Sequence, residues 1–295
     1  MISLAAFPKC WIENISSRQM ALEDWIETSA QLGADGLELY SLFLRSYESE
    51  YLTSIRRRVE SLGMTIPMMC YSPDFTHPDR EFRMREVEKQ KEIIRVTASL
   101  GGSFCRTLSG QKRPEVGIAE GSDYVVECIE ACLPEAERSG ITLVIENHYK
   151  DGFWTHAEFA QKKEVLLPII ERIDSPWFGV QFDPSNALVA GDDAVALLKV
   201  LVSKVKTMHA SDRYLVHGAK LEDVMKSDGT IGYPDKLVHG VTGDGQNDFD
   251  AIFQILAENG FNGWISIEDG MNGMDEMRRS IEFLKSMRLK YFGKV

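Results

Sequence analysis

The hydrophobic pattern of this chain changes repeatedly between the two-residue period of strands and the longer period of helices. Eight short apolar runs have the length and composition of strands: Ile2–Phe7, Gly36–Tyr40, Thr65–Met69, Ser103–Thr107, Thr142–Glu146, Phe178–Asp183, Lys204–His209 and Trp264–Glu268. Eight helical stretches alternate with them: Gln19–Gln31, Glu50–Leu62, Arg80–Leu100, Ser122–Ser139, Ala157–Ile173, Asp193–Leu201, Asp248–Asn259 and Met274–Leu289. Eight such units within 295 residues favour a closed (β/α)8 TIM barrel over an open, doubly wound sheet.

Glycine supports these helix ends independently. It stands just after five of the helical stretches, in the sequences LGADG, LGMT, LGGS, SGIT and NGFNG. A glycine at this position suits the left-handed backbone that commonly ends a helix. We find no linker and no low-complexity tract, so the sequence predicts a single domain over residues 1–295.

One segment interrupts the alternation. Residues Asp212–Asn247 show no convincing helical pattern and contain HGAKLED, SDGTIGYPDKLVHG and GDGQNDF. A loop of this length in a compact domain usually has a function. Because the segment follows the seventh predicted strand, we expect it to lie over the carboxyl ends of the strands, as a lid or as a surface for a partner.

Acidic or imidazole side chains stand where four of the predicted strands end: Glu146, Asp183, His209 and Glu268. In a barrel the carboxyl ends of parallel strands meet at one face, so these side chains should lie together. Taken singly, a carboxylate at a strand end is more often a helix N-cap or a solvated loop residue. Three converging carboxylates, however, would repel one another and take up protons unless a cation lay between them. The mostly oxygen donor set predicts a site for Mn²⁺, Mg²⁺ or Co²⁺.

The sequences around these residues are ITLVIENH, GVQFDPSN, KTMHASD and GWISIEDG, and DGLEL lies in the second predicted strand. With GDGQNDFDAIFQILAENGFNGWISIE they resemble the xylose isomerase-like TIM barrel superfamily, in its sugar phosphate isomerase/epimerase branch. The resemblance covers nearly the whole chain and implies that the four residues bind a metal, typically Mn²⁺ and sometimes Mg²⁺ or Co²⁺. The branch includes ketose 3-epimerases, hydroxypyruvate isomerases, inosose and dehydroshikimate dehydratases, 3-keto-sugar epimerases, C-glycoside deglycosidase subunits and an AP endonuclease.

Two departures from the patterns of this branch narrow the choice. Epimerases of free ketoses usually carry a proline-containing stretch after the first glutamate and a histidine three residues after the aspartate, whereas this chain has Asn147–His148 and Asn186. The AP endonucleases use additional histidine ligands, which the strand ends do not supply here. The net charge of −12 also disfavours a nucleic-acid partner, because an acidic surface repels phosphates.

Three hypotheses for function remain. The first is a metal-dependent isomerase or epimerase of a keto-sugar, in which Glu146 and Glu268 transfer protons on the two sides of a metal-stabilised enediolate. The second is a lyase or dehydratase that expels a β-substituent from a 3-keto-glycoside or an inosose, with His148 as the base. His148 could equally be a hydrogen-bond partner that orients a ligand. The third is a non-catalytic subunit that depends on a partner protein.

Several other residues near the strand ends could contact a sugar: Glu38, Lys9, Arg106, Asn186 and Arg213. Glu38 could equally be buried behind the ligands, and cations in surface loops are common without a function. We expect a small sugar as the partner, and the sequence leaves a homo-oligomer or a second subunit open.

The composition disfavours disulfide-bonded, membrane-spanning and secreted proteins. Five scattered cysteines without a C-x-x-C spacing predict reduced thiols and a cytoplasmic protein. No apolar stretch approaches the roughly 20 residues that span a bilayer, and the opening MISLAAFPKCW lacks the basic region of a signal peptide.

Overall fold

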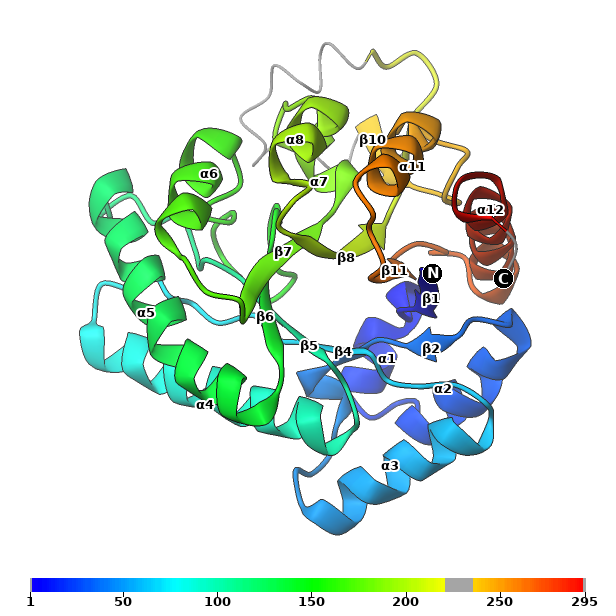
Figure 1. Ribbon diagram of the computed structural model, residues 1–295, viewed down its shortest axis with the longest axis horizontal. Helices are drawn as coiled ribbons and strands as arrows, with labels where there is room; N and C mark the ends of the chain where they lie inside the picture. Colours follow the sequence, from blue (N-terminus) through cyan, green and yellow to red (C-terminus); the bar gives the residue numbers. More distant parts are fainter. Residues whose placement is uncertain (1, 221–235, 294–295) are drawn as a thin grey trace.

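The computed structural model of the protein describes residues 2–220 and 236–293. Its strands form a ring enclosed by helices (Figure 1). Hydrogen-bonded neighbours follow the order β2-β1-β11-β8-β7-β6-β5-β4-β3, and every pair in this sheet is parallel. The elements β2 and β3 are two halves of one strand that is interrupted at Glu38. The prediction of a (β/α)8 barrel is therefore confirmed.

Most strands of the barrel agree closely with the predicted runs, whereas β4 begins three residues after the start of its predicted run. Their bounds are β1 Ser3–Ala6, β2 Gly36–Leu37, β3 Leu39–Tyr40, β4 Met68–Cys70, β5 Phe104–Thr107, β6 Thr142–Glu146, β7 Phe178–Phe182, β8 Val205–Ala210 and β11 Trp264–Ile267. Gly36 allows close approach in β2, since a Cβ there would lie 2.7 Å from the carbonyl oxygen of Thr65. The five glycines that follow the predicted helices all have positive φ angles, between 63° and 84°.

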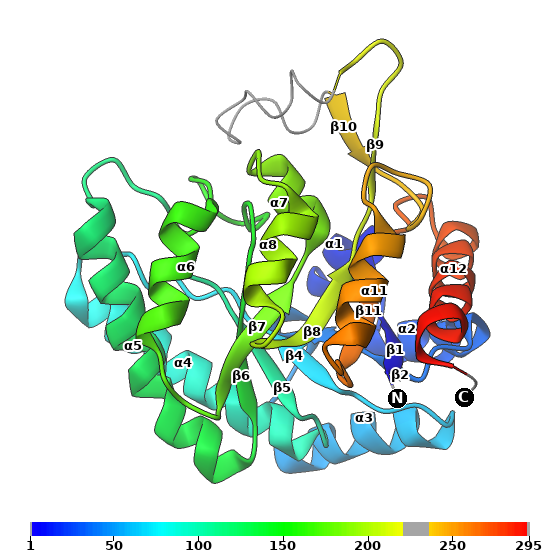
Figure 2. The ribbon, with the colours of Figure 1, turned by 45° about the horizontal axis from the view of Figure 1, so that its top comes forward.

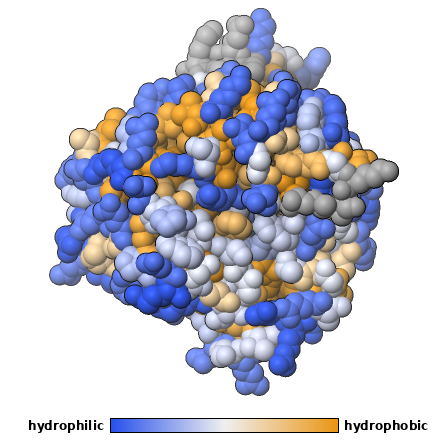
Figure 3. All heavy atoms as spheres, viewed as in Figure 1, coloured by the Kyte–Doolittle hydropathy of each residue, from blue (hydrophilic) through white to orange (hydrophobic). Residues whose placement is uncertain are grey.

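The helices cover the outside of the ring. Their bounds are α1 Ile12–Ser16, α2 Leu22–Ser29, α3 Ser49–Ser61, α4 Arg80–Ser99, α5 Ile118–Ser139, α6 Lys163–Arg172, α7 Pro184–Val189, α8 Ala194–Leu201, α11 Phe249–Glu258 and α12 Met274–Phe292. The short helices α1 and α7 were not predicted. In the view of Figure 3, hydrophilic side chains take up much of the surface and apolar patches lie between them. No helix in the described part of the chain is long and apolar enough to cross a membrane.

The predicted helix Ala157–Ile173 is wrong over its first six residues, because α6 begins only at Lys163. Residues 157–162 instead pair with the loop that follows β5. Phe159 donates its N–H to the carbonyl of Gly110 at 2.8 Å, and a bridge joins Gln111 to Glu158. These contacts engage backbone N–H and C=O groups that would otherwise form the hydrogen bonds of a first helical turn.

The predicted long loop contains regular structure at both of its ends. Strand β9 (Arg213–Leu215) pairs with β10 (Leu237–His239) in an antiparallel ribbon. Figure 2 shows this ribbon extending beyond the carboxyl end of β8. The central part of the segment, 221–235, lies outside the described residues, so its predicted role as a lid stays a prediction. The expectation of an irregular segment is wrong for these two strands. They are separated by 21 residues, so no local sequence pattern indicates that they pair.

Candidate metal centre

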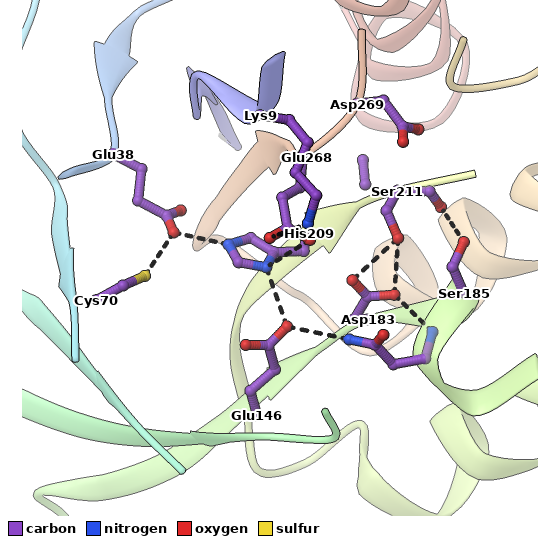
Figure 4. Close-up of polar contacts among 12 residues, drawn as sticks. Lys9, Glu38, Cys70, Glu146, Asp183, Ser185, His209, Ser211, Glu268 and Asp269 are labelled. Carbon is purple, nitrogen blue, oxygen red and sulfur yellow. Dashed lines mark hydrogen bonds and ion pairs between the residues drawn. The ribbon is translucent and has the colours of Figure 1, made fainter. Parts of the chain in front are cut away.

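The four predicted ligands converge at one end of the barrel (Figure 4). They come from neighbouring strands, because β6, β7, β8 and β11 are consecutive in the ring. One ligand atom from each of Glu146, Asp183, His209 and Glu268 lies within 4.8 Å of all the others. All four residues are buried, with exposed fractions between 0% and 6%. The topology thus collects side chains that are up to 122 positions apart in the sequence (146 to 268).

His209 stands between the carboxylates. Its Nδ1 lies 3.1 Å from Glu146 Oε1 and 3.6 Å from Glu268 Oε2. Its Nε2 lies 2.7 Å from Glu38 Oε1, on the other side of the ring. Burial alone would lower the pKa of His209, but Glu38, Glu268 and Glu146 outweigh it and raise the pKa well above its ordinary value. Glu38 also accepts a hydrogen bond from Cys70 Sγ and is fully buried, so it holds the imidazole in place from behind.

Asp183 is held by two further groups. Its carboxylate accepts hydrogen bonds from Ser211 Oγ at 2.8 and 3.0 Å, and from the N–H of Asn186 at 2.9 Å. The second contact caps helix α7, so this residue is both an N-cap and a member of the cluster. Burial, and then the charges of Glu268 and Glu146, raise the pKa of Asp183 to about 6.

The cluster fits a divalent cation. Three buried carboxylates and one imidazole supply a mostly oxygen donor set. Burial and the neighbouring carboxylates raise the pKa of Asp183, and a cation would relieve both effects. When His209 Nε2 donates to Glu38, its Nδ1 is left as an acceptor that faces the other three ligands. The structure agrees with the alternative that Glu38 is buried behind the ligands.

Two cations lie against the outer oxygens of the glutamates. Arg106 Nη1 lies 2.8 Å from Glu146 Oε2, and Lys9 Nζ lies 3.0 Å from Glu268 Oε1. Burial opposes ionisation of Glu146, but His209 and Arg106 lower its pKa to about 2. Burial also opposes ionisation of Glu268, but Lys9 and His209 outweigh it and hold the pKa of Glu268 far below the ordinary range.

The remaining predicted contacts lie around this core. Asn186 Nδ2 donates to Glu146 Oε1 at 3.3 Å. Arg213 is buried at the start of β9, and its guanidinium lies 5.7 Å from the centre of the Tyr149 ring. Neither residue lines the cavity described below, and neither does Glu38. Their predicted contact with a sugar stays a prediction.

A cavity of about 420 Å³ opens beside the cluster. Its polar lining includes Lys9, Arg106, His148, Asp151 and Glu268. Aromatic and aliphatic side chains complete the wall: Phe7, Ile12, Tyr40, Tyr149, Phe153 and Met271. Such a mixture of apolar walls with a few convergent polar groups is typical of small-molecule sites. Of the predicted site residues, Lys9, Arg106, His148 and Glu268 reach this space.

His148 has a buried acidic neighbour that sequence reasoning missed. Its Nδ1 lies 3.5 Å from Oε2 of Glu158. Burial lowers the pKa of His148, but Glu146 and Glu158 outweigh it, so that the pKa is raised. Glu158 escaped notice because it lies within a stretch that reads as helix. Ser211 was also missed, although its position two residues after His209 could have placed it on the same side of the strand.

Comparison with known proteins agrees with this geometry. Residues 26–287 match the family described as xylose isomerase-like TIM barrel. An inosose dehydratase of Bacillus cereus is 25% identical over 282 residues, which cover 90% of this chain and 89% of that protein. The match to the inosose dehydratase of Clostridium perfringens is 27% identical but spans only 42% of that protein and 45% of this chain.

Solved structures show the same fold. The IolI protein with a bound zinc atom superimposes with a TM-score of 0.77 at 15% identity, over 99% of this chain and 100% of that one. A D-tagatose 3-epimerase-like protein gives a TM-score of 0.76 at 18% identity, over 99% and 98% of the two chains. The fold, the strand-end cluster and the extent of the family match together establish that this chain belongs to the xylose isomerase-like TIM barrel family.

Proposed function

We propose that this chain is a divalent-metal-dependent lyase of the dehydratase type, acting on a keto-polyol such as an inosose or on a 3-keto-glycoside. The observation that carries the proposal is the position of His148 in the cavity wall beside the cluster, with a buried carboxylate behind it. The two glutamates of the cluster are each engaged by His209 on one oxygen and by a cation on the other. His148 is therefore the better placed proton acceptor.

The site residues divide the chemistry between them. Glu146, Asp183, His209 and Glu268 would hold Mn²⁺, Mg²⁺, Co²⁺ or Zn²⁺. A bound divalent cation polarises a carbonyl and makes the neighbouring C–H bond more acidic. His148 accepts that proton, the bond from the β-carbon to its oxygen breaks, and the same imidazolium returns the proton to the departing oxygen. The products are an unsaturated ketone and water or an alcohol.

Epimerisation is the second candidate, and the placement of two carboxylates favours it. Glu146 ends β6 and Glu268 directly follows β11, with β7 and β8 between these strands, and both point at the same histidine. Two carboxylates separated in this way could remove a proton from one face of a sugar and return it to the other. The similarity to inosose dehydratases supports elimination instead.

Product analysis in D₂O separates the two reactions. The metal-loaded protein is incubated with an inosose and with 3-keto-glucosides, and the products are identified by mass spectrometry. Elimination releases water or the aglycone and creates an absorbing enone, whereas epimerisation adds deuterium without loss of mass. We expect elimination that disappears in His148→Gln while metal content is unchanged. Deuterium exchange without elimination, retained by that variant, would overturn the proposal in favour of epimerisation.

A further inference from the structure

We propose that Glu158 is the positioning residue of His148, which it holds with Nδ1 toward its own carboxylate and Nε2 toward the cavity. The role assigned to the imidazole rests on the proposed function, whereas its orientation does not. Glu158 is only 1% exposed and does not line the cavity. It therefore acts through His148 and has no direct contact with a substrate.

The two atoms that face each other, His148 Nδ1 and Glu158 Oε2, share the same lack of a hydrogen-bond partner among the described residues. In the described part of the chain, Glu158 Oε2 and His148 Nδ1 are both buried, and neither has a conventional hydrogen bond. They lie 3.5 Å apart, and a buried polar atom without a partner is costly. Side-chain contacts of this kind are often long before a ligand binds and shorten in the complex. The pair is thus the natural way for both atoms to be satisfied.

Glu158 is itself held in place by neighbouring loops. Its Oε1 accepts hydrogen bonds from both the N–H (2.7 Å) and the hydroxyl of Ser109, in the loop after β5. The Ser109 hydroxyl in turn accepts the N–H of Ala160 at 3.0 Å. The backbone N–H of Glu158 donates to the carbonyl of Tyr149, next to His148, at 2.8 Å. Two loops therefore fix the carboxylate relative to the imidazole.

The carboxylate of Glu158 determines which nitrogen of His148 carries the proton. A carboxylate only accepts hydrogen bonds, so the imidazole nitrogen that faces it carries a proton. In a neutral ring the other nitrogen then has a free lone pair. Here that nitrogen is Nε2 of a residue that lines the cavity. This is the tautomer that a base acting on a ligand in the cavity needs. Loss of Glu158 would leave the ring in place and remove this preference.

The variant Glu158→Gln tests this orientation directly. Ser109 donates twice to Oε1, so a glutamine would keep its oxygen there and turn its NH₂ group toward His148. Nδ1 would then have to accept, and the proton would move to Nε2. The measurement is ¹⁵N NMR of the full-length, metal-loaded protein with labelled histidine, in which His148→Gln assigns the signal. Glu130→Gln, on the exposed side of α5, is the matched control.

We expect the wild type and Glu130→Gln to show the Nδ1–H form, and Glu158→Gln to show the Nε2–H form. An unchanged tautomer in Glu158→Gln would overturn the inference. If that variant does not fold, Ser109→Ala serves instead, and it should give a mixture of the two forms. A signal in Ser109→Ala identical to that of the wild type would contradict the inference as well.

Turnover provides a second readout and keeps the two proposals apart. With a substrate found by product analysis, Glu158→Gln should lower kcat by about 10- to 100-fold, as expected for a residue that orients a functional imidazole, with KM and metal content nearly unchanged. An altered tautomer with unchanged turnover would refute His148 as the base but leave its orientation by Glu158 intact. An unaltered tautomer refutes the positioning role whatever the activity.

Discussion

Glu146 and Glu268 reach the same histidine from two flanks of the site, and the flanks are built differently. On the β6 flank, Arg106 binds Glu146 and Ser72, and both members of the ion pair are nearly inaccessible to water. On the β11 flank, Lys9 is 18% exposed and binds Glu268 at the edge of the open cavity. Both cations line the cavity, but the Arg106–Glu146 pair is less accessible to water than the Lys9–Glu268 pair, so equivalent changes should have unequal consequences.

The largest effect should come from the ligands themselves. Glu146→Gln and Glu268→Gln each remove one charge and one donor from the cluster, and both should lose the metal and most turnover, on the order of 10³-fold. Metal content is measured by elemental analysis beside activity. If both variants kept normal metal content and normal turnover, neither glutamate would have a role on either flank.

The ion pairs should separate the flanks. Arg106→Met leaves the carboxylate of Glu146 buried without its cation, so the metal-free protein should lose about 3–5 kcal/mol of stability. Lys9→Met leaves Glu268 beside a cavity that water can enter, and we expect about 1–2 kcal/mol. Urea unfolding of the two variants gives the comparison. Equal losses would show that the flanks are equivalent.

The metal-free cluster should depend on pH with a definite sign. The pKa of Asp183 is raised to about 6 from its ordinary value of 3.8, and that of His209 is raised as well. Both groups stabilise the fold while protonated, and this stability is lost as pH rises through about 6 for Asp183 and through the higher pKa of His209. The metal-free protein should therefore gain stability from these two groups as the pH falls from 7.5 to 5. Glu146 and Glu268, whose pKa values are lowered, have the opposite effect, and it sets in only near their ordinary pKa of 4.5.

Thermal unfolding of the metal-free protein at several pH values checks this expectation. Asp183→Asn should remove much of the dependence, and saturating Mn²⁺ should suppress it, because a cation replaces the protons. A metal-free protein that becomes less stable as the pH falls from 7.5 to 5 would contradict the proposed repulsion.

The smallest effect should lie on the β11 flank. His239 on β10 lies 3.0 Å from Asp269, the residue after Glu268, and so ties the ribbon to the end of β11. His239→Ala should cost about 1 kcal/mol and increase amide exchange in the ribbon. His217→Ala, an exposed histidine between β9 and the undescribed residues, is the control. Equal amide exchange in the two variants would show that the contact does not hold the ribbon.

The sequence predicted those parts of the site that depend on local pattern and topology alone. Each of Glu146, Asp183, His209 and Glu268 directly follows or ends an apolar run, and a parallel barrel brings such positions together. A helix cap and a ligand are not mutually exclusive roles for Asp183, because the residue caps α7 and also belongs to the cluster.

The parts that escaped prediction depend on contacts between loops. Glu158 is defined by its bonds to Ser109 and Tyr149, and a helical pattern conceals its position in the sequence. The ribbon of β9 and β10 could not be predicted either, because two three-residue strands far apart in the sequence show almost no hydrophobic periodicity. Loop residues form much of the cavity wall, so the substrate is harder to predict from the sequence than the metal site.

Anomalous diffraction from crystals grown with Mn²⁺ and without chelator tests the central claim most directly. We predict one strong peak per chain, bonded to carboxylate oxygens of Glu146, Asp183 and Glu268 and to Nδ1 of His209, with Nε2 of His209 still donating to Glu38. A peak bound elsewhere, or none at the cluster, would contradict the account.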